Sequence, residues 1–201
     1  QVRLQALQVH VLMSELQIGQ GQTGLALEHL REAERLSVEL GDSAQQMAIL
    51  PNLAQLELAC LHYDEAEKHA RRLLAEPSMA GNAGLLRILT LSLYGQNRYE
   101  QAAVEARKYM EASPQNPEAY TILAEIQGRL GQPAEQEKTY RLGLTRVAKD
   151  RRIVLYQELL KLYRGRNEAT KEASLLAEIQ ADDGVAAEDK GRLSLLGKSV
   201  D

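Results

Sequence analysis

Phenylalanine and tryptophan are both absent from the 201 residues, and aromatic side chains make up only 4% of the chain. Hydrophobic residues nevertheless reach 44% and charged residues 26%, a balance typical of a folded protein rather than a disordered one. A core built from leucine, alanine and tyrosine suits closely packed helices better than a β-sandwich. The composition therefore favours an all-α fold.

Cysteine is nearly missing as well, since Cys60 is the single thiol and no intrachain disulfide can form. A lone thiol fits a reducing cytoplasm slightly better than an exporting route. No apolar run approaches the roughly 20 residues that a membrane helix needs. The chain begins at Gln1 without a signal-peptide pattern, so we expect a processed or excised fragment that more chain precedes.

No excess of positive charge is present, because 24 basic residues face 28 acidic ones and the net charge is −4. This balance gives no general reason to expect nucleic acid or anionic lipid as a partner.

Strand-like alternation is almost absent, whereas apolar residues recur at helical spacing throughout the chain. Asn116 followed by Pro117 is typical of a helix start, and Gly21, Gly131 and Gly165 are placed where helices should stop. Short loops between such segments require antiparallel neighbours. The predicted helices are 2–19, 22–40, 43–61, 63–75, 82–95, 98–112, 117–130, 133–148, 153–164 and 167–180, with a weaker one near 186–196.

Proline 51 falls inside the third predicted helix. An interior proline removes a backbone hydrogen bond and costs about 3 kcal/mol in a straight helix. We therefore expect a kink or a break near Met47 to Pro51.

A short motif recurs along the chain. Tyr63-Asp64-Glu65-Ala66 and Tyr99-Glu100-Gln101-Ala102 both open a predicted helix and lie 36 residues apart. From Ala102 a further 34 residues leads to Gln136, and 40 residues back from Ala66 leads to Ala26. Periods of this size indicate a helical solenoid.

The pattern around this motif resembles the tetratricopeptide repeat, a 34-residue helix–turn–helix unit with small residues where its helices cross. The large-then-small pairs of its first helix match Met13-Ser14, Leu53-Ala54, Leu89-Thr90 and Leu123-Ala124. Its turn glycine matches Gly21 and Gly131, with Leu61 and Asn97 as departures. Its small residues in the second helix match Ala26, Ala66, Ala102, Ala33 and Gly143, with departures at Gln136, Leu73 and Tyr109.

The resemblance implies a right-handed α-solenoid of antiparallel helix pairs over residues 1–181. Its units are expected at about 7–40, 47–80, 83–116 and 117–150, with a degenerate fifth unit at 151–181. The spacing between the first and second expected units is about six residues longer than the 34-residue period, which indicates an extended helix or loop around Ser37 to Gln46. Residues 182–201 are expected to be a linker and a C-terminal capping helix.

The first predicted helix is apolar around too much of its circumference for the end of a solenoid. Either a preceding unit covers this face, which we favour, or the face pairs with a second copy to give a homo-oligomer.

Motifs for catalysis or for binding a nucleotide, a metal or RNA are only weakly matched in this sequence. The Gly19–Gly24 segment matches G-x-G-x-x-G, but a helix and not a strand precedes it, so we interpret it as a turn. Cys60 and His62 lack the spacing of a metal site, and no nucleophile constellation is present. The run Arg146, Lys149, Arg151, Arg152 is interpreted as a solvated turn rather than a phosphate or RNA contact. We expect no enzyme activity, no metal and no cofactor.

In the tetratricopeptide-repeat family, the first helix of each unit lines a concave groove that touches the ligand. The resemblance places in such a groove the residues Val11, Glu15, Ile18, Gln55, Leu58, Arg87, Leu91, Tyr94, Thr121 and Glu125. One row of these positions, Ile18, Leu58 and Tyr94, is more apolar than exposed positions usually are, which is typical of a contact surface. Partial packing of these residues within their own unit is the alternative.

The function implied by the resemblance is a protein–protein interaction scaffold that binds a peptide segment or helix of a partner. A peptide-sensing regulatory domain of a larger protein is the alternative, and an RNA-binding helical repeat is less favoured.

Overall fold

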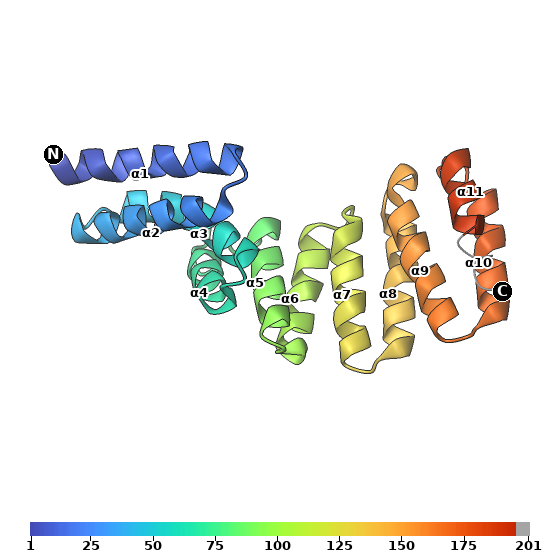
Figure 1. The fold of residues 1–201 in the computed structure, drawn as a ribbon. Coiled ribbons are helices and arrows are strands. Elements are labelled where there is room, and N and C mark those ends of the chain that lie inside the picture. The colour runs from blue at the N-terminus through green and yellow to red at the C-terminus, as the bar shows by residue number, and fades with distance from the viewer. Residues whose placement is uncertain (196–201) are drawn as a thin grey trace. The chain divides into compact units, whose positions relative to one another are not determined.

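Helices account for all the regular structure that the computed structural model describes, which is residues 1–195 (Figure 1). No strand occurs in this range. Eleven α-helices and one short 3₁₀ turn, η1 (Lys149–Arg151), follow one another. The α-helices are α1 (Val2–Gly19), α2 (Thr23–Glu39), α3 (Ser43–Ala59), α4 (Tyr63–Leu74), α5 (Ala83–Gly95), α6 (Tyr99–Ala112), α7 (Pro117–Arg129), α8 (Pro133–Arg146), α9 (Ile153–Gly165), α10 (Ala169–Ala181) and α11 (Ala187–Leu195). The prediction of an all-α fold is confirmed.

The turns within the five helix pairs share one geometry. A residue with positive φ follows the first helix of each pair, and its amide and the next one bond back to that helix. In the first turn, Gln22 N donates to Gln17 O over 2.8 Å and Gly21 N to Ile18 O over 3.0 Å, the pattern of a Schellman cap. The positive-φ residues are Gly21, Leu61, Asn97, Gly131 and Asn167. Gly165 ends α9, as expected, and Asn167 takes the left-handed position of the turn that follows.

The long first junction contains no extended loop. A sixth turn of the same kind, at Gly41, joins α2 directly to α3, and Asp42 caps α3 by accepting a hydrogen bond from Gln45 N at 2.9 Å. The extra residues therefore lengthen helices, since α2 and α3 have 17 residues each whereas α4 has 12.

Proline 51 does not break α3, which is continuous from Ser43 to Ala59. Of the two expected outcomes, a kink or a break near Met47 to Pro51, the break does not occur. Packing explains how the helix tolerates the lost hydrogen bond, because Leu50, Leu53 and Ala54 on either side of the proline are fully buried.

Two compact units divide the chain between Tyr109 and Met110, a point inside α6 and inside the repeat expected at 83–116. The first unit buries small residues at its helix crossings, which lets helix axes approach closely. These residues are Ala26, Ala33, Ala54, Ala66, Ala70, Ala102 and Ala106. Leucines such as Leu30, Leu50 and Leu53 fill the space around them.

The second unit has a core rich in tyrosine. Tyr120, Tyr140, Tyr156 and Tyr163 are buried with leucines of α8, α9 and α10. Helix α11 contributes Leu193, which is completely buried. A helix is thus present from Ala187 to Leu195 in the segment where a capping helix was expected, and Leu196, its expected last residue, lies outside the described residues.

None of the described helices is long and apolar enough to cross a membrane.

Candidate functional site

The first helices of successive pairs enclose a hollow of about 450 Å³ between α3 and α5. Leu85 and Ile88 of α5 are its buried floor, and Pro51 of α3 contributes a half-buried ring. The remaining lining residues are Asn52, Gln55, Met79, Asn82 and Gly84. The hollow therefore joins an apolar floor to a rim of amide side chains.

The amides of this rim are not equivalent. The side chain of Asn82 already has a structural role, because its Oδ1 accepts a hydrogen bond from Leu85 N at 3.1 Å and caps α5. Asn52 and Gln55 are exposed on α3, and neither makes a side-chain hydrogen bond to another residue of the described range 1–195. These two side chains are available to donate to and accept from a ligand.

A second hollow of about 320 Å³ lies between α1 and α3. It is lined by Leu7, Gln8, Val11, Leu12 and Gln45, so it holds Val11 of the predicted groove. Its character is more apolar than that of the α3–α5 hollow.

The second unit has a hollow of its own, of about 350 Å³, between α7, α8 and α9. Predicted groove residues Thr121 and Glu125 line it together with Gln136, Tyr140, Val154 and Glu158. Two carboxylates, Glu125 and Glu158, give this hollow an acidic character, and burial followed by these charges raises the pKa of the Tyr140 hydroxyl far above its ordinary value.

The other predicted groove residues differ in exposure. Glu15 and Ile18 are exposed on α1, whereas Arg87 and Leu91 of α5 are half-buried. Tyr94 is half-buried against the ring of Tyr99, with 5.5 Å between ring centroids.

Leu58 is buried in the core of the first unit. The expected row of exposed apolar residues is thus incomplete, because Leu58 presents no surface to a ligand.

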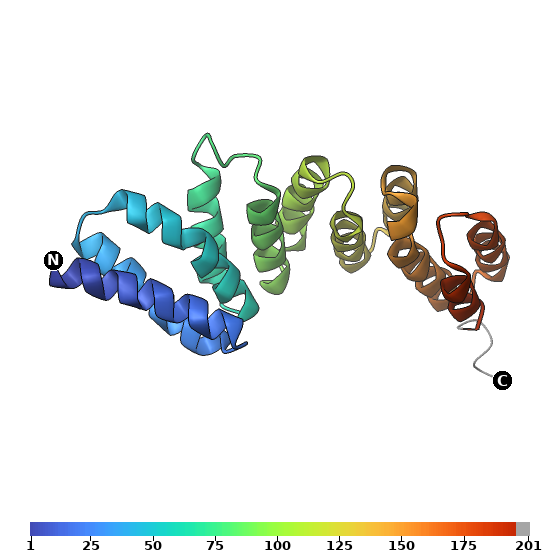
Figure 2. The same ribbon diagram turned by 90° about the horizontal axis from the view of Figure 1, so that it is seen from above.

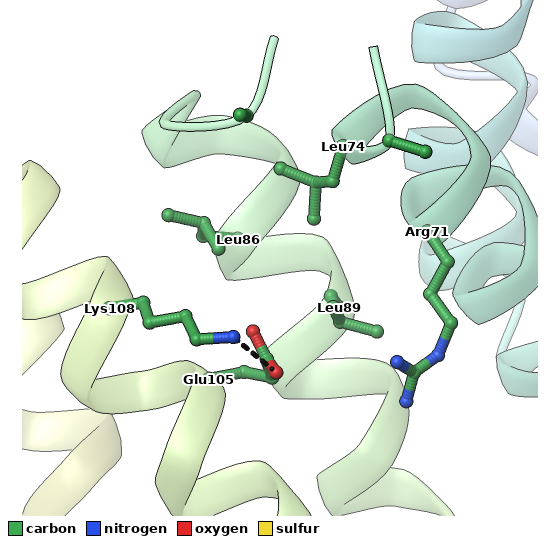
Figure 3. A pocket seen from close by; sticks show the side chains of 8 residues that line it. Arg71, Leu74, Leu86, Leu89, Glu105 and Lys108 are labelled. Atoms are coloured by element: carbon green, nitrogen blue, oxygen red, sulfur yellow. Dashed lines mark hydrogen bonds and ion pairs between the residues drawn. The ribbon is translucent and has the colours of Figure 1, made fainter. Parts of the chain in front are cut away.

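A different face of α5 borders a smaller hollow of about 270 Å³ between α4, α5 and α6 (Figure 3). Leu74, Leu86 and Leu89 provide its apolar wall. Lys108 and Glu105 point toward each other across it, with 3.0 Å between Nζ and Oε1, and Arg71 reaches in from α4. Lys108 and Glu105 pair with each other and Arg71 pairs with Glu67, so this hollow offers less to a polar ligand than the α3–α5 hollow.

Buried polar contacts hold α2, α3 and α4 of the first unit together. Glu57 is buried, and its Oε2 lies 2.7 Å from Nδ1 of His69. Arg31 Nε is 3.7 Å from the other carboxylate oxygen of Glu57, and Glu34 Oε1 is 3.5 Å from His69 Nε2. The contacts span three helices, which is the arrangement of a structural network.

A second carboxylate, Glu67, joins α4 to the turn before α6. Its oxygens accept hydrogen bonds from Arg71 Nε at 2.9 Å, Gln96 Nε2 at 2.8 Å and Arg98 at 2.6 Å. Burial alone would raise the pKa of this carboxyl, but the hydrogen bonds from Gln96 and Arg71 and the charge of Arg98 outweigh it and lower the pKa below its ordinary value.

The basic run of the second unit is partly neutralised by acids. Arg152 pairs with Asp182 at 3.1 Å, and Lys149 pairs with Asp183. These contacts join the start of α9 to the end of α10, which supports the interpretation of the run as part of a turn.

Possible metal ligands do not converge in the described part of the chain, where no group of three or more His, Cys, Asp or Glu side chains could hold an ion. His62 Nδ1 lies 3.0 Å from Arg31, and Cys60 is half-buried. The Gly19–Gly24 segment comprises the last residue of α1, the turn between α1 and α2, and the first two residues of α2.

Sequence reasoning chose Gln55 but missed Asn52, Met79 and Asn82, which line the same hollow. Asn82 had a signal, since an asparagine before an apolar run is typical of a helix start. Met79 lies in the irregular segment between α4 and α5, where helical periodicity carries no information.

Comparison with known proteins finds similarity in structure only. No protein-family model matches the sequence, and no curated protein matches it. Among solved structures, MamA from Desulfovibrio magneticus RS-1, from residue 41 to its end, has a TM-score of 0.67 at 15% identity, covering 98% of this chain and 97% of that one. A thermophilic TPR protein of Thermus thermophilus has a TM-score of 0.57 at 15% identity, with 94% and 97% covered. A putative kinesin light chain of Podospora anserina with TPR-like repeats has a TM-score of 0.67 at 16% identity, with 87% and 93% covered.

Proposed function

Since this chain has the tetratricopeptide-repeat fold, we propose that it is a protein–protein interaction scaffold, not an enzyme, and that it holds a peptide segment of a partner against its first helices. The observation that carries the proposal is the hollow between α3 and α5, with its apolar floor and exposed amides.

The chemistry of this hollow suits an extended peptide. Amide side chains can both donate and accept, so Asn52 and Gln55 match the alternating N–H and C=O groups of a backbone. Leu85 and Ile88 below them would receive one apolar side chain of the peptide, which supplies affinity through burial. The two features together favour an apolar anchor held in a defined register.

Charge selects the residues that flank the anchor. Glu15 is exposed on α1 of the same unit. A basic residue near one end of the bound segment would complement this carboxylate. The proposed ligand is thus a segment with an apolar anchor and a basic residue beside it.

The test uses peptides selected from a random peptide library with the 201-residue chain as bait, followed by calorimetric measurement of the dissociation constant. Asn52→Arg and Gln55→Arg place a bulky charged side chain over the floor and should weaken binding at least ~10-fold, or by about 1.4 kcal/mol. Gln115→Arg, at an exposed position in the loop before α7, is the matched control and should leave binding unchanged. Equal binding by all three folded variants would remove the α3–α5 hollow from the proposal.

A protein partner is favoured over nucleic acid because the net charge is −4 and two members of the basic run pair with acids. Nucleic-acid binding would show a steep loss of affinity with added salt. Titration of RNA at two salt concentrations distinguishes these partners.

A further inference from the structure

A hollow of about 260 Å³ lies between α9 and α11 of the second unit. Figures 1 and 2 show these two helices next to α10, in orange to red, at the C-terminal end of that unit. Leu160 of α9 and Leu193 of α11 are buried and form the apolar part of its lining. Gln157, Lys161 and Arg164 of α9 form the polar part. We call this site the α9–α11 hollow.

Charge distinguishes the α9–α11 hollow from the hollows described above. No carboxylate of residues 1–195 lines it, whereas glutamates line both the α4–α6 hollow and the hollow between α7, α8 and α9. The acids that pair with its cations lie outside its lining. Glu158 Oε1 is 2.7 Å from Lys161 Nζ, and Glu172 Oε1 of α10 is 2.6 Å from Arg164 Nε. Two positive charges therefore border this hollow without a negative charge in its wall.

The guanidinium of Arg164 also has a donor to spare. Its Nε donates to Glu172, but its Nη2 is buried and has no hydrogen-bond partner among residues 1–195. Buried donors in native proteins nearly always have a partner, so an unsatisfied donor in the wall of a hollow indicates a binding position for an acceptor.

Other buried polar atoms without a hydrogen bond in the described range do not combine these two features. Gln17 Oε1 and Ser92 Oγ belong to side chains that line none of the hollows described here. Glu168 Oε2 has an ion-pair partner in Lys171 at 3.2 Å. Arg164 is the residue of the described range that joins an unsatisfied donor to a hollow.

We propose that the α9–α11 hollow binds a carboxylate that carries a short aliphatic chain. The carboxylate would accept hydrogen bonds from Arg164 and from Lys161, whose ammonium has three protons and one acidic partner. The aliphatic chain would lie against Leu160 and Leu193. The amide of Gln157, which makes no side-chain hydrogen bond within residues 1–195, is available to orient the carboxylate. A purely inorganic anion matches the lining less well, because it leaves the two leucines without an apolar partner.

The α9–α11 hollow is independent of the α3–α5 hollow, because the two belong to different compact units. The repeat register, which aligns Tyr156 with Tyr120, places Lys161 at the position of Glu125, one of the predicted groove residues. A carboxylate could therefore reach the site from two sources, a free small acid or an acidic side chain of a bound protein. Both sources present the same chemical group, so the hollow is assigned to the group and the experiment distinguishes the sources.

Titration of the ¹⁵N-labelled 201-residue chain with valerate, followed by NMR, tests the proposal. We expect saturable shifts of the Nε–Hε signal of Arg164 and of the backbone amides of α9 and α11. Pentanamide has the same chain without the charge, and inorganic phosphate has charge without the chain, so each should bind at least ~10-fold more weakly. The α-amide of N-acetylglutamic acid presents only a side-chain carboxylate. Tighter binding of this compound than of valerate would identify an acidic protein residue as the source, and weaker binding a free acid.

Substitutions separate the two cations. Lys161→Gln leaves the contact between α9 and α10 intact and should weaken valerate binding about 3-fold. Lys138→Gln is the matched control, because Lys138 is 71% exposed where Lys161 is 70% exposed, and each pairs at 2.7 Å with a glutamate three residues earlier. Arg164→Lys keeps a positive charge beside Glu172 but removes the spare donor, so it should weaken binding at least ~10-fold. Circular dichroism should show unchanged helix content in all three variants.

Several results would overturn the proposal. The first is the absence of saturable valerate shifts in α9 and α11 at tens of millimolar ligand. The second is equal binding by the wild type and by folded Lys161→Gln and Arg164→Lys variants. The third is equally tight binding of inorganic phosphate, which would reveal an anion site without an apolar part. None of these results bears on the peptide test of the α3–α5 hollow, since that test changes residues of the first unit.

Discussion

The ring of Tyr63, the first residue of α4, lies directly on Gly95, the last residue of α5. A β-carbon on residue 95 would stand 2.4 Å from Cζ of the ring, closer than real contacts allow. Tyr63 begins the motif that recurs 36 residues later, so the repeat places a large ring at the point where two neighbouring helices meet. The packing of α4 on α5 depends on the absence of a side chain at Gly95.

Gly95→Ala should therefore destabilise the first unit, because the ring of Tyr63 must move or the helices must separate. Overpacking of this kind costs about 1–3 kcal/mol. Gly24→Ala is the control, since nothing lies within 4 Å of a β-carbon there and alanine favours a helix by ~1 kcal/mol. Urea unfolding followed by circular dichroism should show opposite shifts for the two variants. Equal shifts would mean that the close contact is not the cause.

The left-handed turn at Leu61 offers a stabilising change. Leu61 has φ of 63° and a side chain that is 66% exposed, so it carries steric strain and little burial. Leu61→Gly should raise the free energy of unfolding by about 0.5–1 kcal/mol. This value is the steric strain that glycine relieves, minus the cost of the greater flexibility that glycine gives the unfolded chain. Gly21→Ala, at the same position of the first helix pair, should have the opposite sign. A destabilised Leu61→Gly would show that the leucine makes a contact that outweighs its strain.

The ends of the helices could be predicted to within about two residues, because residue types that cap or begin a helix are recognisable in the sequence. Asn116 and Pro117 are the N-cap and first residue of α7, as expected. The backbone conformation of the turns was harder to predict from the sequence. Leu61 and Asn97 looked like departures from a glycine position, yet both adopt the positive φ that the turn requires. The type of residue indicates only how readily a position adopts positive φ. The packing of the two helices that the turn connects forces the position to adopt it.

The groove was harder to predict because exposure depends on neighbours. Ile18 and Leu58 share one register position, yet Ile18 is exposed and Leu58 is buried. Spacing assigns both to the same side of their helices, but it does not specify what packs there. The hollow between α3 and α5 also needs Met79 from an irregular segment, which no periodicity places.

The buried contact between Glu57 and His69 should matter for stability as a pair. Glu57→Leu or His69→Leu leaves the other side chain buried without its 2.7 Å partner, a loss of about 1–3 kcal/mol. The double variant should lose less than the sum of the single variants, because neither buried member of the pair is then left without the other. Urea unfolding of all four proteins gives this coupling. Additive losses would show that Arg31 and Glu34 satisfy either residue alone.

The pKa of Glu67 predicts acid weakening of the first unit. Because the folded-state pKa lies below the ordinary value of 4.5, the stabilisation is fully present above about pH 4.5. It is lost as the pH falls through the lower folded-state pKa, where the carboxylate binds a proton and releases Arg71, Gln96 and Arg98. Hydrogen exchange of the α4 amides, measured by mass spectrometry, should therefore accelerate relative to the intrinsic rate as the pH falls below 4.5.

Substitution isolates the contribution of Glu67 from that of other carboxyls. Glu67→Gln keeps hydrogen-bonding capacity but has no charge, so its α4 protection should be lower at neutral pH and should change less on acidification. Glu65→Gln, an exposed residue of the same helix, should follow the wild type. If Glu67→Gln retained the full pH dependence, another titrating group would be responsible, and the three hydrogen bonds to Glu67 would have no linkage to folding.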